Sequence, residues 1–211
     1  ASKPYGLSPA RIRRRGHASS FEVLTRSIAS QQLSGIAAAR IIERIIAQHG
    51  GRFPEPPALA RATPEALRAT GLSFAKIAAV QDLAQRALDG RFPDDATLAA
   101  LDDESVIGHC VAVRGIGRWT AQMLLMFHLG RTDVLPVDDY GVRNGFRLAY
   151  GLKGLPLPRA LAQFGARWQP WRSAAAWYLW RAVEMHQAGT LAPPARPAPR
   201  VAIAIAKQPL P

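Results

Sequence analysis

The apolar residues of this chain are spaced three and four positions apart over most of its length. Phe21, Leu24 and Ile28 follow this spacing, and Ile41 and Ile45 are four apart. Residues at this spacing share one face of an α-helix, whereas a half-buried strand alternates apolar and polar residues. Glycine and proline divide the helical stretches into segments. The pattern therefore predicts an all-α fold of about ten short helices.

The predicted helices have recognisable starts and stops. Thr63 followed by Pro64 is typical of a helix N-terminus, and Gly90 ends another predicted helix. Residues 52–58, RFPEPPA, are predicted to form a proline-rich loop. The ranges with helical spacing are 21–28, 36–48, 63–67, 73–88, a short segment from 95, 102–113, 118–127, 139–150, 158–168 and 171–187.

Basic residues are concentrated at the two ends of the chain. Lysine and arginine number 27 against 15 aspartate and glutamate, which gives a formal net charge of +12. Residues 1–20 and 190–211 contain basic residues and no acidic ones. Such ends suit a polyanion, of which nucleic acid is the simplest case, or they serve only to keep the protein in solution.

We expect one helical domain between these ends, with two lobes and a cleft between the lobes. The first helix is expected to fold back onto the C-terminal lobe. The expected divisions are a basic N-terminal arm that packs on the C-terminal lobe (1–20), the helical domain (21–189), its lobes (about 30–135, and 136–189 with the N-terminal segment), and a Pro-rich basic tail (190–211) that contains the one predicted strand, VAIAIA (201–206).

Cysteine and hydropathy exclude several classes of protein. Cys110 is the single cysteine, so the chain forms neither an internal disulfide nor a four-cysteine metal site. No apolar run reaches the length of about 18 residues that a membrane span needs, and the first residues lack the apolar core of a signal peptide. We therefore expect a soluble, intracellular protein.

Residues 109–127, HCVAVRGIGRWTAQMLLMF, contain the most informative break in the helical pattern. Gly115 and Gly117 flank Ile116 between one predicted helix and the next. Glycine at these positions leaves backbone N–H groups uncovered at a helix N-terminus, where the helix dipole favours an anion. The segment is therefore either an ordinary tight turn or a hairpin that binds a DNA phosphate.

Three motifs, in this order, are similar to those of a known enzyme family. They are GIGRWTA at 115–121, DDY at 138–140 and WQPWRSAAAWYLW at 168–180. Together they resemble the helix-hairpin-helix (HhH-GPD) superfamily of DNA glycosylases, in its alkylpurine branch of the 3-methyladenine DNA glycosylase II type. The resemblance runs from about residue 20 to 187 and implies a compact form without the N-terminal β-domain of longer members.

The resemblance implies a monofunctional enzyme of base excision repair. Such an enzyme flips cationic purines, such as 3-methyladenine and 7-methylguanine, out of duplex DNA and hydrolyses the N-glycosidic bond. The implied partner is double-stranded DNA with alkylated bases, with no membrane, and the protein is expected to be a monomer. The expected location is the cytoplasm beside the nucleoid in a bacterium, or the nucleus in a eukaryote. A glycosylase for another base lesion and a non-catalytic DNA-binding module remain as alternatives.

Asp138 and Asp139 are adjacent acids just before a predicted helix. Acids at this position are typical N-caps, so both could serve only as caps. Breaking an N-glycosidic bond leaves positive charge on the sugar, and a carboxylate near C1′ stabilises that charge while it helps to position water. The resemblance assigns this catalytic role to Asp139.

The resemblance also assigns residues that hold the base and the DNA. The base pocket is expected to contain Trp119, Met123 and Trp180, since aromatic faces bind cationic purines well. Met123 stands where the family has tyrosine, and its softer side chain favours a wider range of bases. The other assignments are DNA contacts by Gly115, Gly117, Arg118, Thr120 and Arg143, an intercalating loop at Gln31, Gln32 and Leu33, and a structural monovalent cation, the one cofactor implied, on the carbonyl oxygens of Val111, Val113 and Ile116.

Two of these assignments have simpler alternatives. Within the loop, Gln32 aligns with the side chain that inserts into DNA and Leu33 is the second choice, but the loop could equally be an ordinary polar connection. Arg143 could pair with an acid one turn earlier, such as Asp139, instead of a phosphate.

Trp119 leads to a first test. Superfamily members that also cut the DNA strand carry a lysine at this position, and its amine attacks C1′ to form a Schiff base. Tryptophan has no such nucleophile. We therefore expect no covalent product when the protein is incubated with damaged DNA and sodium borohydride, as judged by denaturing electrophoresis. A borohydride-trapped adduct would contradict the hydrolytic interpretation.

Overall fold

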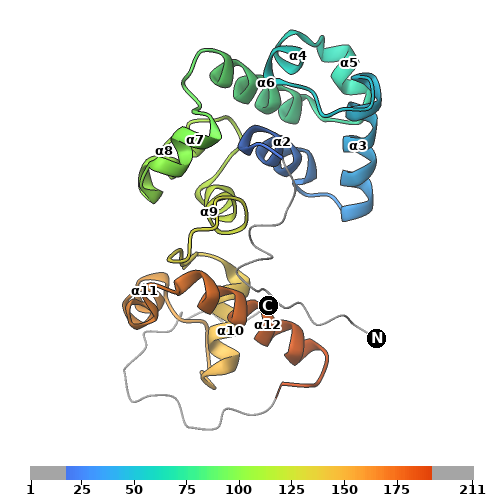
Figure 1. The fold of residues 1–211 in the computed structure, drawn as a ribbon. Coiled ribbons are helices and arrows are strands. Elements are labelled where there is room, and N and C mark those ends of the chain that lie inside the picture. The colour runs from blue at the N-terminus through green and yellow to red at the C-terminus, as the bar shows by residue number, and fades with distance from the viewer. Residues whose placement is uncertain (1–17, 192–211) are drawn as a thin grey trace. The chain divides into compact units, whose positions relative to one another are not determined.

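The computed structural model describes residues 18–191, and this range is helical with no β-strand (Figure 1). The prediction of an all-α fold is confirmed. None of the described helices is both long and apolar enough to span a bilayer. The chain divides into two compact units, Ala1–Gly130 and Arg131–Pro211. The helices are α2 (Ser20–Ser30), α3 (Gly35–Gln48), α4 (Pro56–Arg61), α5 (Pro64–Ala69), α6 (Phe74–Leu88), α7 (Asp95–Ala100), α8 (Asp103–Val111), α9 (Arg118–Phe127), α10 (Tyr140–Ala149), α11 (Pro158–Gly165), the 3₁₀ helix η1 (Ala166–Trp168) and α12 (Arg172–Gln187).

The first unit is built around α2, which packs against α3, α6 and α9. The buried face of α2 carries Leu24 and Ile28, because apolar residues repeat there at helical spacing. Leu83 of α6 and Leu125 of α9 are fully buried in the same unit. Helices α4 and α5 pack on α6, and α8 packs on α9. The core of this unit is therefore made by helix faces from its whole length.

The place of α2 differs from the expectation, which put the first helix with the C-terminal lobe. The structure groups it with α3, α6 and α9, and the N–H of Ser20 also donates to Asp95 Oδ1 at 2.8 Å. The reason is that helical spacing identifies an apolar face but not the face that it meets. Most of the expected basic arm (1–17) and tail (192–211), with the strand predicted at 201–206, lies outside the described residues.

In the second unit, α10 and α12 pack closely because glycines face the contact. A Cβ on Gly145 would lie 1.9 Å from the carbonyl oxygen of Leu179, so no other residue fits there without moving the helices. Aromatic rings fill the space beside this contact in stacked and edge-to-face arrangements. These rings belong to Phe146, Tyr150, Phe164 and Trp168.

Many helices begin at a side-chain cap. A Ser, Thr or Asp side chain accepts the backbone N–H three residues later at Ser19, Ser34, Thr63, Ser73, Asp94, Asp102 and Asp139. Helix α4 corrects the sequence analysis, because Pro56 and Pro57 belong to the predicted loop at 52–58. They occupy the first turn of a helix, where the missing N–H of proline breaks no helical bond.

The glycine contact can be tested by substitution. Gly145→Ala should destabilise the protein by about 1–3 kcal/mol or more, because the new Cβ collides with the Leu179 carbonyl. Gly108→Ala is the matched control, since a Cβ on this helical glycine meets no atom within 4 Å. Loss of a helical glycine should stabilise the control by roughly 0.5–1 kcal/mol. Urea denaturation measures the stability of both variants. Equal denaturation midpoints for the two would contradict the close packing of α10 on α12.

Candidate active site and nucleic-acid interface

Asp139 is the N-cap residue of α10, and two donors bind the same oxygen of its carboxylate. Oδ1 accepts the backbone N–H of Val142 at 2.6 Å and the indole N–H of Trp180 at 2.8 Å. Together these bonds fix the direction of the carboxylate, and a helix N-terminus is a favourable place for negative charge. Asp138 beside it is exposed. The cap and the candidate catalytic group are therefore one residue, Asp139.

Trp180 reaches this carboxylate because residue 141 is glycine. A Cβ at Gly141 would lie 2.7 Å from Cδ1 and 3.0 Å from Nε1 of the Trp180 indole. A larger residue would therefore displace the ring that donates to Asp139. Gly141 was not among the site residues predicted from the sequence. Its one signal is a glycine inside a predicted helix, a position that glycine otherwise destabilises.

The loop that leads into α10 is anchored by the first turn of α12. Ser173 Oγ donates to the carbonyl of Arg131 at 2.7 Å and accepts the N–H of Val134 at 3.0 Å. Arg172 binds both carboxylate oxygens of Asp133, at 2.6 and 2.9 Å. The helix that carries the indole donor thus also holds the start of the loop. Neither contact was predicted from the sequence.

Three side chains predicted to contact DNA are engaged or buried within the protein. Arg143 Nε donates to the carbonyl of Pro156 at 2.9 Å and not to an acid one turn earlier. Arg118 pairs with Glu104, and the guanidinium lowers the pKa of that carboxyl. Thr120 is buried, so its side chain faces the core. Phosphate contacts from these side chains stay predictions.

The predicted hairpin is a turn whose two glycines have different tasks. Gly115 has a φ of 74°, a backbone conformation that is unfavourable for residues other than glycine. Ile116 is buried and fixes the turn to the core of the first unit. Gly117 is the N-cap of α9 and offers no side-chain acceptor to the first N–H groups of that helix. This geometry suits an anion at the start of α9.

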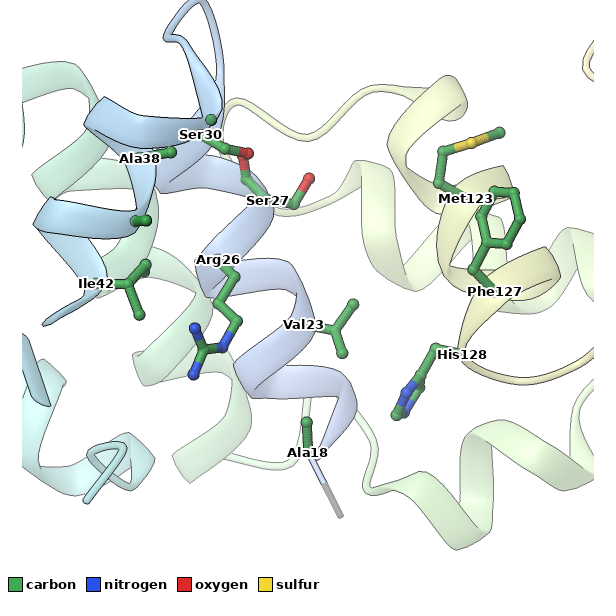
Figure 2. Close-up of a pocket in the computed structure, with 12 residues that line it drawn as sticks. Ala18, Val23, Arg26, Ser27, Ser30, Ala38, Ile42, Met123, Phe127 and His128 are labelled. Carbon is green, nitrogen blue, oxygen red and sulfur yellow. The ribbon is translucent and has the colours of Figure 1, made fainter. Parts of the chain in front are cut away.

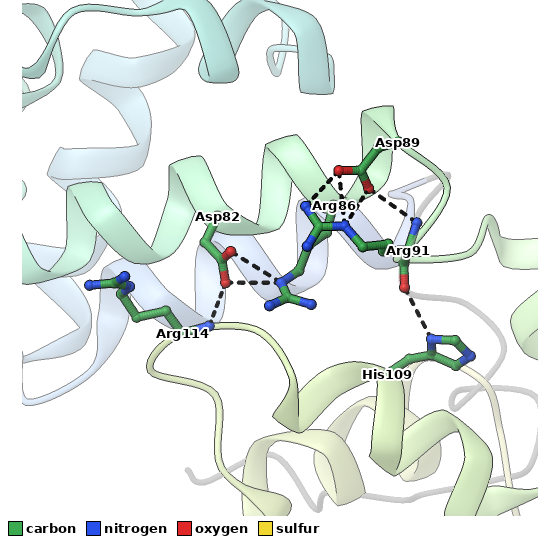
Figure 3. Close-up of polar contacts among 6 residues, drawn as sticks. All are labelled: Asp82, Arg86, Asp89, Arg91, His109 and Arg114. Carbon is green, nitrogen blue, oxygen red and sulfur yellow. Dashed lines mark hydrogen bonds and ion pairs between the residues drawn. The ribbon is translucent and has the colours of Figure 1, made fainter.

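A carboxylate on α6 holds the other side of this turn. Asp82 Oδ2 accepts the backbone N–H of Arg114 at 2.8 Å, and Arg86 Nε binds both oxygens of Asp82 at 3.1 Å (Figure 3). Asp82 was not predicted from the sequence, because its partner in the turn lies 32 residues away. An acid four residues before an arginine on a helix is typical of an ordinary surface pair.

The predicted cation would bind carbonyl oxygens of Val111, Val113 and Ile116 around the same turn. The Val113 carbonyl accepts the N–H of Ile116 at 3.2 Å, which leaves one lone pair for another partner. Within residues 18–191 no group of three or more His, Cys, Asp or Glu side chains is arranged to hold a metal ion. A carbonyl site does not depend on such a group, so the cation stays a prediction.

The predicted intercalating loop connects α2 to α3, and its three residues behave differently. Gln32 has a φ of 58°, which is uncommon for a residue other than glycine. Gln32 and Leu33 are exposed. Gln31 instead binds the hairpin, since its Nε2 donates to the carbonyl of Gly115 at 2.9 Å. The loop therefore presents two side chains to solvent and uses the third to contact the hairpin.

Met123 lines a groove of about 470 Å³ bounded by α2, α3 and α9 (Figure 2). The side chains of Met123 and Phe127 come from α9, and Val23 and Ser27 come from α2. Trp119, also on α9, is 52% exposed. Trp180 belongs to the second unit. The assignment of Trp119, Met123 and Trp180 to one base pocket stays a prediction.

Comparison with known proteins agrees with the family resemblance that the three sequence motifs indicated. The chain matches the family model described as HhH-GPD superfamily base excision DNA repair protein over residues 25–170. It is 38% identical to DNA-3-methyladenine glycosylase 1 of Schizosaccharomyces pombe over 162 residues, which is 76% of this chain and 71% of the relative.

Solved structures of such proteins have a similar fold. The 3-methyladenine DNA glycosylase Mag1 of S. pombe, in complex with abasic DNA, gives a TM-score of 0.70 at 36% identity and covers 80% of this chain and 82% of its own. A DNA-3-methyladenine glycosidase from Bacillus halodurans gives a TM-score of 0.74 at 37% identity, with coverage of 80% and 77%.

The ion pair between Arg172 and Asp133, which anchors the loop before α10, can be tested by measuring stability at acid pH. The Arg172 guanidinium holds the pKa of Asp133 below its ordinary value. The pair therefore stabilises the folded protein above the ordinary carboxyl pKa of about 4, and this is lost as the pH falls through the lowered value. Because the pair is about one-third exposed, Asp133→Asn should cost about 1 kcal/mol or less at neutral pH.

Urea denaturation at about pH 7 and about pH 2.5 measures this difference. The cost of Asp133→Asn should be smaller at the lower pH, because Asp133 is then more often protonated. Asp138→Asn, at an exposed acid of the same loop, is the control and should leave both midpoints unchanged. An equal cost at both pH values would show that the ion pair is not its source.

Proposed function

The chain belongs to the HhH-GPD superfamily of base excision DNA repair proteins, and we propose that it is a DNA glycosylase of the 3-methyladenine type. It removes alkylated purines, such as 3-methyladenine and 7-methylguanine, from duplex DNA. The bond between the base and C1′ of deoxyribose is hydrolysed, and water supplies the hydroxyl group left at C1′. The relatives and structural neighbours named DNA-3-methyladenine glycosylases support this function.

The observation that carries the proposal is the held carboxylate of Asp139. Departure of the base leaves positive charge on the sugar. A carboxylate whose direction is already fixed by Val142 and Trp180 stabilises that charge without reorganising at the moment of reaction. Asp139 therefore has two proposed tasks, which are to stabilise the sugar cation and to position the attacking water.

We propose that aromatic side chains bind the alkylated base. Alkylation at N3 or N7 gives a purine a positive charge, which makes it a better leaving group and a better partner for an aromatic face. We assign this contact to Trp119 and Trp180, with Met123 as an adaptable neighbour. Trp180 then serves twice, because its N–H orients Asp139 while its ring face remains suited to a cation.

The proposed partner is double-stranded DNA, bound by one copy of the protein. The N–H groups that follow Gly117 at the start of α9 bind a phosphate, and a monovalent cation on the hairpin carbonyls would add positive charge beside it. Gln32 or Leu33 fills the gap that the flipped nucleotide leaves. With this substrate, the protein acts in the cytoplasm beside the nucleoid in a bacterium, or in the nucleus of a eukaryote.

Base release tests the function directly. Duplex DNA with mixed alkylation is incubated with the protein, and the free bases are separated by chromatography. Asp139→Asn should lower the rate of release by about 100-fold or more, because the uncharged amide cannot stabilise the sugar cation. Binding to duplex DNA with an abasic site, measured by gel shift, should be unchanged.

Asp138→Asn is the matched control and should keep the rate of the unmodified protein, since its side chain is exposed beside the N-cap. Turnover retained by Asp139→Asn would refute the assignment of Asp139. A protein that binds the duplex and releases no base would instead be a non-catalytic DNA-binding module.

A further inference from the structure

We propose that Lys76 and Asp82 are positioning residues, which from one helix, α6, hold the intercalating loop and the hairpin in a fixed arrangement that base flipping requires. The inference rests on the proposed function. Neither side chain needs to touch DNA or the reacting atoms, because each binds a backbone group of a segment that does. The two residues lie six positions apart on the same helix.

Lys76 holds the loop. Its ammonium donates to the carbonyl of Ala29 at 2.8 Å and to that of Gln31 at 2.7 Å. These carbonyls belong to the last turn and the C-cap of α2. The last helical acceptors lack partners there, and a positive charge is favourable. The carbonyl of Gln31 belongs to the peptide group just before Gln32. Lys76 therefore supports the residue with the uncommon φ of 58°.

Asp82 holds the hairpin. Its carboxylate accepts the N–H of Arg114, the residue just before Gly115, and Arg86 fixes the carboxylate from one turn further along α6 (Figure 3). An anchored acceptor at this point fixes the turn that leads to the start of α9. Asp82 thus acts on the hairpin as Lys76 acts on the loop.

Gln31 completes the connection between the two segments, since its side chain donates to the Gly115 carbonyl at 2.9 Å. The contacts form a closed circuit: α6 binds the loop, the loop binds the hairpin, and the hairpin binds α6. All of its members lie in the first unit. A displacement of either segment would break at least one of these bonds.

Base flipping makes such a circuit useful. The inserted side chain of the loop must enter the duplex beside the target nucleotide while the hairpin holds the phosphate of that strand. Small errors in these positions have large effects on the rate. A target base that is already unpaired needs no inserted side chain. Loss of the circuit should therefore slow excision from a paired duplex far more than excision from a bulge.

The experiment compares single-turnover release of 7-methylguanine from two DNAs, a fully paired duplex and the same sequence with the lesion in a single-base bulge. Lys76→Ala and Asp82→Ala should each lower the rate about tenfold on the paired duplex and less than about twofold on the bulge. Lys76→Arg keeps a cationic donor and Asp82→Asn keeps an acceptor for Arg114 N–H, so both should recover most of the rate.

Asp89→Asn is the matched control. It removes an exposed carboxylate that pairs with Arg91 just past the end of α6 and touches neither segment (Figure 3). Its rate should equal that of the unmodified protein on both DNAs. Gln31→Ala removes one exposed hydrogen bond without removing a charge, so it carries the same test if an α6 variant fails to fold.

Equal losses on the two DNAs, or no loss on either, would overturn the inference while the proposed function stands. No release of base by the unmodified protein from either DNA would overturn the proposed function, and the inference with it. Combining Lys76→Ala with Gln31→Ala should cost less than the product of the single effects, since both act through one loop.

Discussion

The close contact between α10 and α12 is the constraint on which the candidate active site depends. Gly141 and Gly145 are four residues apart and therefore lie on one face of α10. With no Cβ at either position, the backbone at Leu179 and the indole of Trp180 come closer to α10 than a side chain would allow. Glycine weakens an isolated helix, but here it lets α12 deliver a hydrogen-bond donor to Asp139. The aromatic rings beside the contact supply the burial that offsets this weakness.

The first unit follows a different principle, in which charged and amide side chains bind other groups of the protein itself. Arg118 is paired with Glu104, and Gln31 binds the Gly115 carbonyl. The groups that suit a phosphate are then the backbone N–H groups behind the glycine cap of α9. Backbone donors are fixed in direction but give no long-range attraction. The net charge of +12 supplies that attraction in a form that needs no fixed geometry. In the proposed function, the placement of DNA and its long-range attraction therefore have different sources in the chain.

Sequence patterns predicted those features that neighbouring residues determine. Helical spacing, side-chain caps and the Gly-Ile-Gly break identified the all-α fold, the hairpin turn and the helix start at Asp139. Helix α4 was missed because consecutive prolines fit a loop as well as a first helical turn. The predicted packing partner of α2 was wrong, because an apolar face does not specify which helices cover it. The bond from Gln31 to a carbonyl 84 residues away leaves no local pattern, and this contact was not predicted. Asp82 and Lys76 were missed for the same reason. The assignment of Gln31 to the intercalating loop came from the family resemblance and stays a prediction.

Lys76 also bears on the choice between hydrolysis and attack by an amine. Burial lowers the pKa of Lys76, which is a property that an amine nucleophile needs. Its geometry argues against that role, because the two carbonyls at 2.7 and 2.8 Å accept N–H bonds and thereby favour the ammonium form. A nucleophilic amine must instead present a lone pair to C1′. Position 119, where strand-cutting members of the superfamily carry lysine, is tryptophan. With Lys76 engaged by the loop and no amine at 119, water is the nucleophile that this arrangement favours, and Asp139 is the group proposed to assist it.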